Sequence, residues 1–158
     1  MHGVLPTGAG RAFSAGGNVI AMQETIATIA DPDVWEDGMP EAKRIMFRML
    51  ECNNPIITRI NGHAVGLGAT VALLCGIIIA VDHAKVGDPH VNAGLVAGGG
   101  ALIWPQLIGF ARAKEFLLTA DLMTAAEAER IELINHVVPP DWVSPATGRP
   151  RDAVDPLD

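Results

Sequence analysis

Residues 61–81, NGHAVGLGATVALLCGIIIAV, are the stretch that most limits how this chain can fold. Gly62, Gly66 and Gly68 open the stretch, a short apolar segment follows, and a run of β-branched residues begins after Gly76. Glycine is needed where the backbone takes a positive φ or comes very close to another group, and β-branched residues favour strands. The order predicts a turn, a buried helix and a buried strand, with main-chain N–H groups available at the turn.

The same stretch raises the alternative of a membrane span. Ala64 to Val81 contain no charged residue and approach the length of a spanning helix. However, glycines interrupt the segment, its second half favours strand, and no aromatic or basic belt flanks it. Because a helix followed by a doubly buried strand has the same hydropathy, we expect no membrane insertion.

Composition predicts one globular domain and limits its partners. The chain has 158 residues, of which 49% are hydrophobic and 18% charged, so a sizeable core can form. The net charge is −7 without a Lys or Arg cluster, which argues against nucleic acid and anionic membranes as partners. Cys52 and Cys75 lack the spacing of a metal or disulfide framework. We expect reduced thiols in or near the core of a cytoplasmic protein, and the N-terminal residues show no secretory signal.

Helical and strand patterns alternate along the chain, which predicts an α/β domain with right-handed crossovers. The expected helices lie at 19–29, 40–53, 111–120 and 124–134. The expected strands lie at 55–60, 79–82 and 136–138. Residues 84–109, which are rich in glycine, are interpreted as an irregular segment that lines a site, followed by a short helix. Residues 140–158 are rich in proline, so we expect a poorly ordered tail after a domain of residues 1–139.

Two glycine turns, RAFSAGG at 11–17 and AVGLG at 64–68, each stand where a strand-like run gives way to a helix. Each turn alone is more simply explained by tight packing. Brought together, the two turns could aim two backbone N–H groups at one oxygen. Such an oxyanion hole stabilises charge that develops on a carbonyl, and removing one donor typically costs about 3 kcal/mol of barrier.

Four segments together resemble the crotonase, or enoyl-CoA hydratase/isomerase, family. They are TGAGRAFSAGG, PIITRINGHAVGLGATVALLCG, GDPHVNAGLVAGGG and LLTADLMTAAEAERIELINHVVP, in the family's order and approximate spacing between Leu5 and Pro139. The resemblance implies a spiral of strand-strand-helix turns, a crotonase-like ββα fold. It also implies a coenzyme A thioester as substrate, no permanently bound cofactor, and an oxyanion hole that stabilises a thioester enolate.

The resemblance also assigns individual residues. It gives the backbone N–H of Gly17 as the first oxyanion donor and the N–H of Leu67 as the second. A main-chain donor does not depend on the side chain, so leucine at position 67 is compatible with this role. The residues that the resemblance places at the coenzyme A binding strand or in the two turns are Ala15, Gly16, Gly66 and Gly68.

The acid and base depart from the family pattern. Hydratases of this family use two glutamates, and the matching positions here are Thr70 and His90. Threonine does not exchange protons near neutral pH, whereas a histidine with a pKa of about 6.5 can act as a general base. A one-base isomerisation or another enolate reaction is therefore favoured over water addition. No partner next to His90 in the sequence is expected to tune it, and a structural histidine is the alternative.

Other features of the sequence concern metals and the ends of the family pattern. The histidines form no HExxH or comparable cluster, so no metal is predicted.

Glu132 occupies a usual glycine position near the end of a helix, and Gly76 stands where relatives usually carry an acidic residue. The chain starts without the family's first strands and ends without its final helices, which usually help to form trimers. We therefore expect a truncated member, with a catalytically impaired acyl-CoA-binding or subunit-interaction protein as the alternative function.

Overall fold

The structure is a computed structural model that describes residues 3–18 and 40–141, and within these residues the strands form two sheets. The three-stranded sheet is entirely parallel, in the order β2 (Ile57–Ile60), β4 (Ile77–Val81) and β7 (His136–Val138). The four-stranded sheet has the order β1 (Ala12–Ser14), β3 (His63–Val65), β5 (Lys85–Gly87) and β6 (Met123–Thr124). Its last strand runs antiparallel to β5, and the other pairs are parallel.

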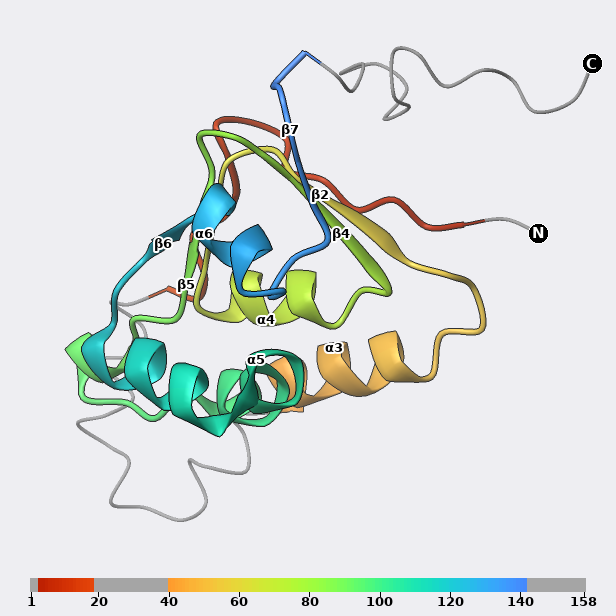
Figure 1. The fold of residues 1–158 in the computed structure, drawn as a ribbon. Helices are drawn as coiled ribbons and strands as arrows, with labels where there is room; N and C mark the ends of the chain where they lie inside the picture. Colours follow the sequence, from red (N-terminus) through yellow and green to blue (C-terminus); the bar gives the residue numbers. More distant parts are fainter. Residues whose placement is uncertain (1–2, 19–39, 142–158) are drawn as a thin grey trace, which may run out of the picture.

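The helices follow the strands in a repeating order. The described helices are α3 (Pro40–Leu50), α4 (Leu67–Leu73), the 3₁₀ helix η1 (His90–Ala93), α5 (Gly98–Thr119) and α6 (Ala125–Arg130). Two successive strand-strand-helix repeats are present, β2-β3-α4 and β4-β5-α5. In each repeat the first strand joins the three-stranded sheet and the second joins the four-stranded sheet. The ββα spiral predicted from the sequence is confirmed, and α4 lies between the strands and α5 (Figure 1).

The glycine-rich stretch at 61–81 folds as predicted. Its apolar segment is the seven-residue helix α4, and its β-branched run is the strand β4, in which Ile78 and Ala80 are buried. The membrane alternative for Ala64 to Val81 is wrong, because the segment contains a strand, a helix and a second strand. No helix within residues 3–18 and 40–141 is both long and apolar enough to cross a membrane.

One hydrophobic core joins both sheets to the helices. Small residues let α4 pack closely, since Ala69 and Ala72 are fully buried, and Trp104 of α5 is the largest fully buried side chain. Both cysteines were expected in or near the core; Cys75 is buried, whereas Cys52 is exposed and lies outside the core. Cys52 follows the end of α3, where the chain turns along the surface.

The segment at 84–109 is more regular than predicted. It contains β5, η1 and the first half of α5, which starts at Gly98 and includes Pro105. The expected division before the helix at 111–120 is present as a break at Gly109, where φ is 77° and ψ is 159°. The helix expected at 19–29 and residues 142–158 of the expected tail lie outside the described residues.

Helix α6 has both of the terminal signals that its sequence suggests. Thr124 accepts a hydrogen bond from the N–H of Glu127 at 3.2 Å, which confirms the predicted cap. At the other end, Glu132 has φ of 65° and donates its N–H to the carbonyl of Glu129 at 2.9 Å, while Leu133 donates to Ala128 at 2.8 Å. These two bonds form a Schellman motif, whose left-handed position usually holds glycine.

Replacing Glu132 with glycine should therefore stabilise the protein. Relief of the left-handed strain contributes roughly 1 kcal/mol, partly offset by the greater freedom of glycine in the unfolded chain. Urea denaturation measures the change. Glu132→Ala is the matched control, because it removes the side chain and leaves a Cβ at positive φ. Equal stability of the glycine and alanine variants would contradict the explanation by strain.

Candidate active site

The loop before the first glycine turn is fixed by Asn61, which directly follows β2. The side-chain Oδ1 of Asn61 accepts the N–H of Gly8 at 2.7 Å, and its Nδ2 donates to the carbonyl of Gly10 at 2.8 Å. The loop then enters β1, which pairs in parallel with β3. Because parallel strands place equivalent ends at one edge of a sheet, the turns that follow β1 and β3 come together.

The two predicted glycine turns are in direct contact. Gly16 has φ of 89° and Gly66 has φ of 56°, so both take conformations that side chains disfavour. A Cβ built on Gly16 would lie 2.8 Å from the carbonyl oxygen of Val65, which is closer than real Cβ atoms come. The juxtaposition that the sequence only suggested is thus present, and glycine is required for it.

Gly17 and Leu67 carry the N–H groups predicted to form the oxyanion hole. Within the described part of the chain, neither N–H donates a hydrogen bond to another protein group. Leu67 is the first residue of α4, and the first N–H groups of a helix have no partner inside the helix. By contrast, the N–H of Gly66 is bound to the carbonyl of Gly87 at 2.9 Å. Two main-chain donors thus remain available beside the contact between the turns.

A small cavity of about 60 Å³ opens where the turns meet. The residues that line it are Ala15, Gly16, Gly17, Val65, Gly66, Pro89, His90 and Ala93. Four of the predicted site residues from the two glycine turns, Ala15, Gly16, Gly17 and Gly66, therefore share this cavity with His90. Leu67 does not line the cavity, but it directly follows Gly66 and begins α4.

His90 lies over the second glycine turn. A Cβ built on Gly66 would be 3.4 Å from Cε1 of the His90 ring, so the imidazole packs against the glycine backbone. The side chain of His90 is 20% exposed, and its Nδ1 is hydrogen-bonded to Oδ1 of Asp88. The histidine is the single titratable side chain among the residues lining the cavity.

Asp88 is the residue of this site that the sequence analysis missed. It is 1% exposed, and its Oδ1 also accepts the backbone N–H of His90 at 3.4 Å. The expectation that no nearby residue tunes His90 is therefore wrong. Pro89 between them has φ of −86° and ψ of 28°, a turn that brings the two side chains together. The Asp-Pro-His order was the available signal, because proline favours such a turn.

Contact with Asp88 changes the acid-base properties of His90. The hydrogen bond to the Asp88 carboxylate raises the pKa of His90 above its usual value, partial burial opposes the change, and the negative charge of Asp88 adds to it. In the neutral ring, Nδ1–H donates to Asp88, so Nε2 is the nitrogen that can accept a proton. The geometry thus gives the cavity one proton acceptor.

Thr70 and Gly68 lie on the buried side of α4. Thr70 is 3% exposed and does not line the cavity. A Cβ built on Gly99 would lie 2.7 Å from Cγ2 of Thr70 and 2.6 Å from Sδ of Met46, which places the threonine between α5 and α3. A Cβ on Gly68 would lie 2.4 Å from Cβ of Ser14, so this glycine lets α4 approach β1. The structure therefore does not bring Thr70 into the cavity that His90 lines.

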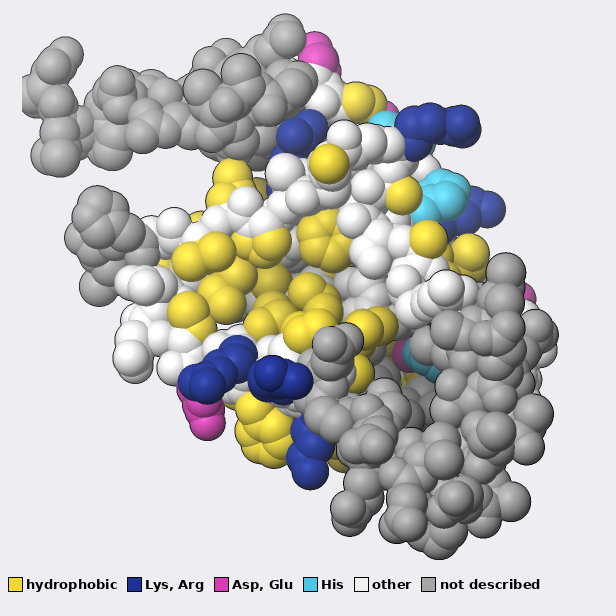
Figure 2. All heavy atoms as spheres, turned by 180° about the vertical axis from the view of Figure 1, so that it is seen from behind, with side chains coloured by type: hydrophobic (Ala, Val, Ile, Leu, Met, Phe, Trp, Pro, Cys, Tyr) yellow, Lys and Arg dark blue, Asp and Glu magenta, His cyan; other side chains and the backbone are white. Residues whose placement is uncertain are grey.

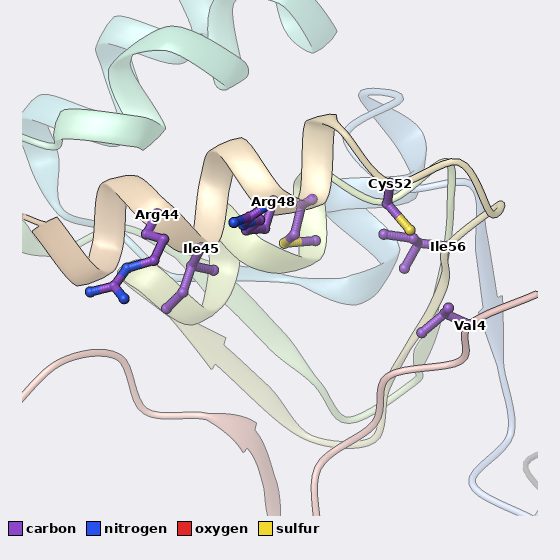
Figure 3. Close-up of a pocket in the computed structure, with 7 residues that line it drawn as sticks. Val4, Arg44, Ile45, Arg48, Cys52 and Ile56 are labelled. Atoms are coloured by element: carbon purple, nitrogen blue, oxygen red, sulfur yellow. The ribbon is translucent and has the colours of Figure 1, made fainter.

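A larger groove of about 550 Å³ lies elsewhere, along α3 (Figure 3). The residues that line it are Val4, Arg44, Ile45, Arg48, Met49, Cys52 and Ile56. The groove is mostly apolar, and Ile45 in its lining is 42% exposed. Hydrophobic side chains also gather at the surface on the face shown in Figure 2, with Lys and Arg side chains at their border. None of the predicted site residues lines this groove.

Within residues 3–18 and 40–141, no group of three or more His, Cys, Asp or Glu side chains could hold a metal ion. His63 accepts the N–H of Lys85 at 3.2 Å, and His83 contacts Asp82 at the same distance, but both histidines are exposed. The cavity between the glycine turns thus has one titratable side chain, the imidazole of His90, in its lining.

Comparisons with known proteins agree with the fold. A family model described as enoyl-CoA hydratase/isomerase matches residues 1–147. The crotonyl-CoA hydratase of Syntrophomonas wolfei is 39% identical over 145 residues, which are 90% of this chain and 54% of that protein. The crystal structure of an enoyl-CoA hydratase/isomerase from Mycobacterium paratuberculosis matches with a TM-score of 0.77 and 39% identity, covering 88% of this chain and 55% of the other.

The enoyl-CoA hydratase of Bacillus anthracis has a TM-score of 0.79 and 29% identity, and the match covers 89% of this chain and 53% of that structure. This chain therefore spans about half the length of the relatives that it matches.

The raised pKa of His90 predicts a pH-dependent contribution to stability. The contribution is fully present below the pKa of a histidine in the unfolded chain, about 6.5, and is lost as pH rises through the higher pKa of the folded state. The difference in unfolding free energy between the wild type and His90→Gln should shrink as pH increases through that range. Urea denaturation at a series of pH values measures it. A difference that stays constant with pH would contradict the assignment of the shift to the folded state.

Proposed function

The chain belongs to the enoyl-CoA hydratase/isomerase family, and we propose that its site acts on an acyl-coenzyme A thioester by stabilising an enolate. The observation that carries the proposal is the position of His90. Its ring, bound to a buried carboxylate, lines the same cavity as both glycine turns. A proton acceptor and carbonyl-directed N–H groups are the two parts that formation of an enolate needs.

In this proposal, the N–H groups of Gly17 and Leu67 donate hydrogen bonds to the carbonyl oxygen of the thioester. Neither donates a hydrogen bond within the described fold, and the residues that precede them, Gly16 and Gly66, lie against each other where the turns meet. Donors that are already in place need no reorganisation when charge develops on the oxygen. Ala15, Gly16, Gly66 and Gly68 support these turns, and Ala15 is the member exposed at the mouth of the cavity.

His90 is the base. In an isomerisation, Nε2 removes a proton from the carbon next to the carbonyl of a 3-enoyl thioester, and the electron pair moves onto the carbonyl oxygen. The same nitrogen then returns the proton to the far carbon of the former double bond, as the electrons move back. Atoms and charge balance with one base. Because Thr70 is buried outside the cavity and has no carboxylate, this course is favoured over two-glutamate hydration.

The alternative function is an acyl-CoA-binding or subunit-interaction protein with impaired catalysis. Two observations favour it: Thr70 offers no second acid or base, and the apolar groove along α3 leaves hydrophobic side chains exposed. The proposal also includes coenzyme A as part of the substrate rather than a permanent cofactor and a homotrimer, as the family resemblance implies, and a cytoplasmic location, as expected from the cysteines. Light scattering of the purified protein tests the trimer.

Turnover of a 3-enoyl-CoA to the 2-enoyl-CoA, followed by absorbance, tests the leading proposal. His90→Gln should lower kcat by about 10²- to 10⁴-fold, the usual contribution of a general base. Binding of the thioester, measured by calorimetry, should change little, because the N–H donors are untouched. His83→Gln is the matched control, since His83 also contacts a neighbouring aspartate but is exposed and distant from the cavity lining.

The outcomes separate the two functions. Binding without turnover in the wild type would support the acyl-CoA-binding protein. Turnover that survives in His90→Gln would overturn the assignment of the base. A protein that binds no coenzyme A thioester would contradict both functions.

A further inference from the structure

The carboxylate of Asp88 is held from two sides. On one side it accepts hydrogen bonds from Nδ1 and from the backbone N–H of His90. On the other side it faces the first turn of α5, because a Cβ built on Gly100 would lie 2.4 Å from Oδ2 of Asp88. Asp88 therefore connects the start of α5 to the ring that lines the cavity.

The first turn of α5 is suited to a negative charge. The first intrahelical bond runs from the N–H of Ala101 to the carbonyl of Ala97 at 2.8 Å, so the N–H groups of residues 98–100 precede it. Ala97 supplies no side-chain cap. The N-terminus of a helix carries a partial positive charge, which stabilises a nearby carboxylate. The glycine at position 100 lets that carboxylate approach.

The second carboxylate oxygen of Asp88, Oδ2, is buried. This oxygen is inaccessible and has no hydrogen-bond partner within the described residues. A buried carboxylate without full hydrogen bonding is costly and is kept where the surrounding field and a specific partner compensate for it. Here the field comes from α5 and the partner is His90. The buried carboxyl group of Asp88 thus lies between the start of α5 and the histidine that lines the cavity.

We propose that Asp88, seated against the first turn of α5 at Gly100, is the positioning residue of the site and fixes the orientation and tautomer of His90. This inference rests on the proposed function of His90 as the base. It adds a claim about a different residue and a different helix. With Nδ1–H directed to Asp88, Nε2 carries the lone pair, and the ring stays packed on Gly66 at the cavity. A histidine without this anchor could present either nitrogen.

Few other charged groups lie where they could change the pKa of His90. The cavity lining from the turns after β1 and β3 contributes Ala15, Gly16, Gly17, Val65 and Gly66, none of which titrates. Pro89 and Ala93 of the adjoining segment do not titrate either. Asp88 is the charged group that acts on the ring within the described residues.

The first experiment uses Asp88→Asn. ¹⁵N NMR of the imidazole should show a single neutral tautomer in the wild type, protonated on Nδ1, and a mixture or the other tautomer in the variant. The pKa of His90 should fall in the variant, because the carboxylate that raises it is gone. If the protein turns over a 3-enoyl-CoA, kcat should fall by about 10²- to 10⁴-fold with KM little changed, and the acidic limb of the pH profile should move to lower pH.

The second experiment leaves both side chains in place. Gly100→Ala puts a methyl group 2.4 Å from Oδ2 of Asp88 and should displace the carboxylate and, through it, the ring. Displacement by about 1 Å in an active site can cost on the order of 10²-fold in rate. Gly98→Ala is the matched control, since it lies in the same helical turn and its Cβ meets nothing within 4 Å. Its kcat and its imidazole spectrum should equal those of the wild type.

The readouts separate this inference from the proposed function. An unchanged His90 tautomer and pKa in both Asp88→Asn and Gly100→Ala, with circular dichroism showing folded variants, would overturn the positioning role. A tautomer change in both variants supports the positioning role, whether or not the wild type shows turnover. Absence of turnover in the wild type would contradict the proposed function alone. If Asp88→Asn does not fold, the comparison of Gly100→Ala with Gly98→Ala decides the question.

Discussion

Contact between the main chains at Gly16 and Gly66 is the constraint on which the rest of the site depends. The parallel pairing of β1 with β3 brings both turns to one edge of the four-stranded sheet, and no Cβ fits where Gly16 meets Val65. Because α4 begins directly after Gly66, its unpaired first N–H is set beside the turn. The positions of the two N–H groups thus follow from backbone packing and do not depend on the side chain at position 67.

A second set of contacts, between Asp88 and His90, holds a titratable side chain at the cavity beside the two glycine turns. In space, Asp88 lies between the start of α5 and His90. Its buried carboxylate contacts the helix on one side and the imidazole on the other. The backbone part can only bind and stabilise charge, whereas the histidine can move a proton.

The local patterns of the sequence predicted much of this fold. The turn, helix and strand of residues 61–81, the Thr124 cap of α6 and the closing strand at 136–138 all form as predicted. The strands β1, β3 and β5 were not predicted as separate elements, because their three residues lie in or beside glycine-rich segments that were interpreted as turns or as irregular structure. The break at Gly109 divides α5 into the short helix and the helix at 111–120 that were expected, whereas the start of the first of these at Gly98 was not located from the sequence.

The sequence by itself determined the glycine turns, their order and the residue types available to the site, because these depend on local spacing. It also indicated the left-handed position of Glu132, where the family pattern expects glycine. Only the tertiary structure decided that His90 has a buried partner, that Thr70 faces α3 and α5, and that Cys52 is exposed. The pairing of Asp88 with His90 is local in the chain, but the position of Asp88 against the first turn of α5 and that of Thr70 beside Gly99 depend on contacts between elements, which no local pattern can locate.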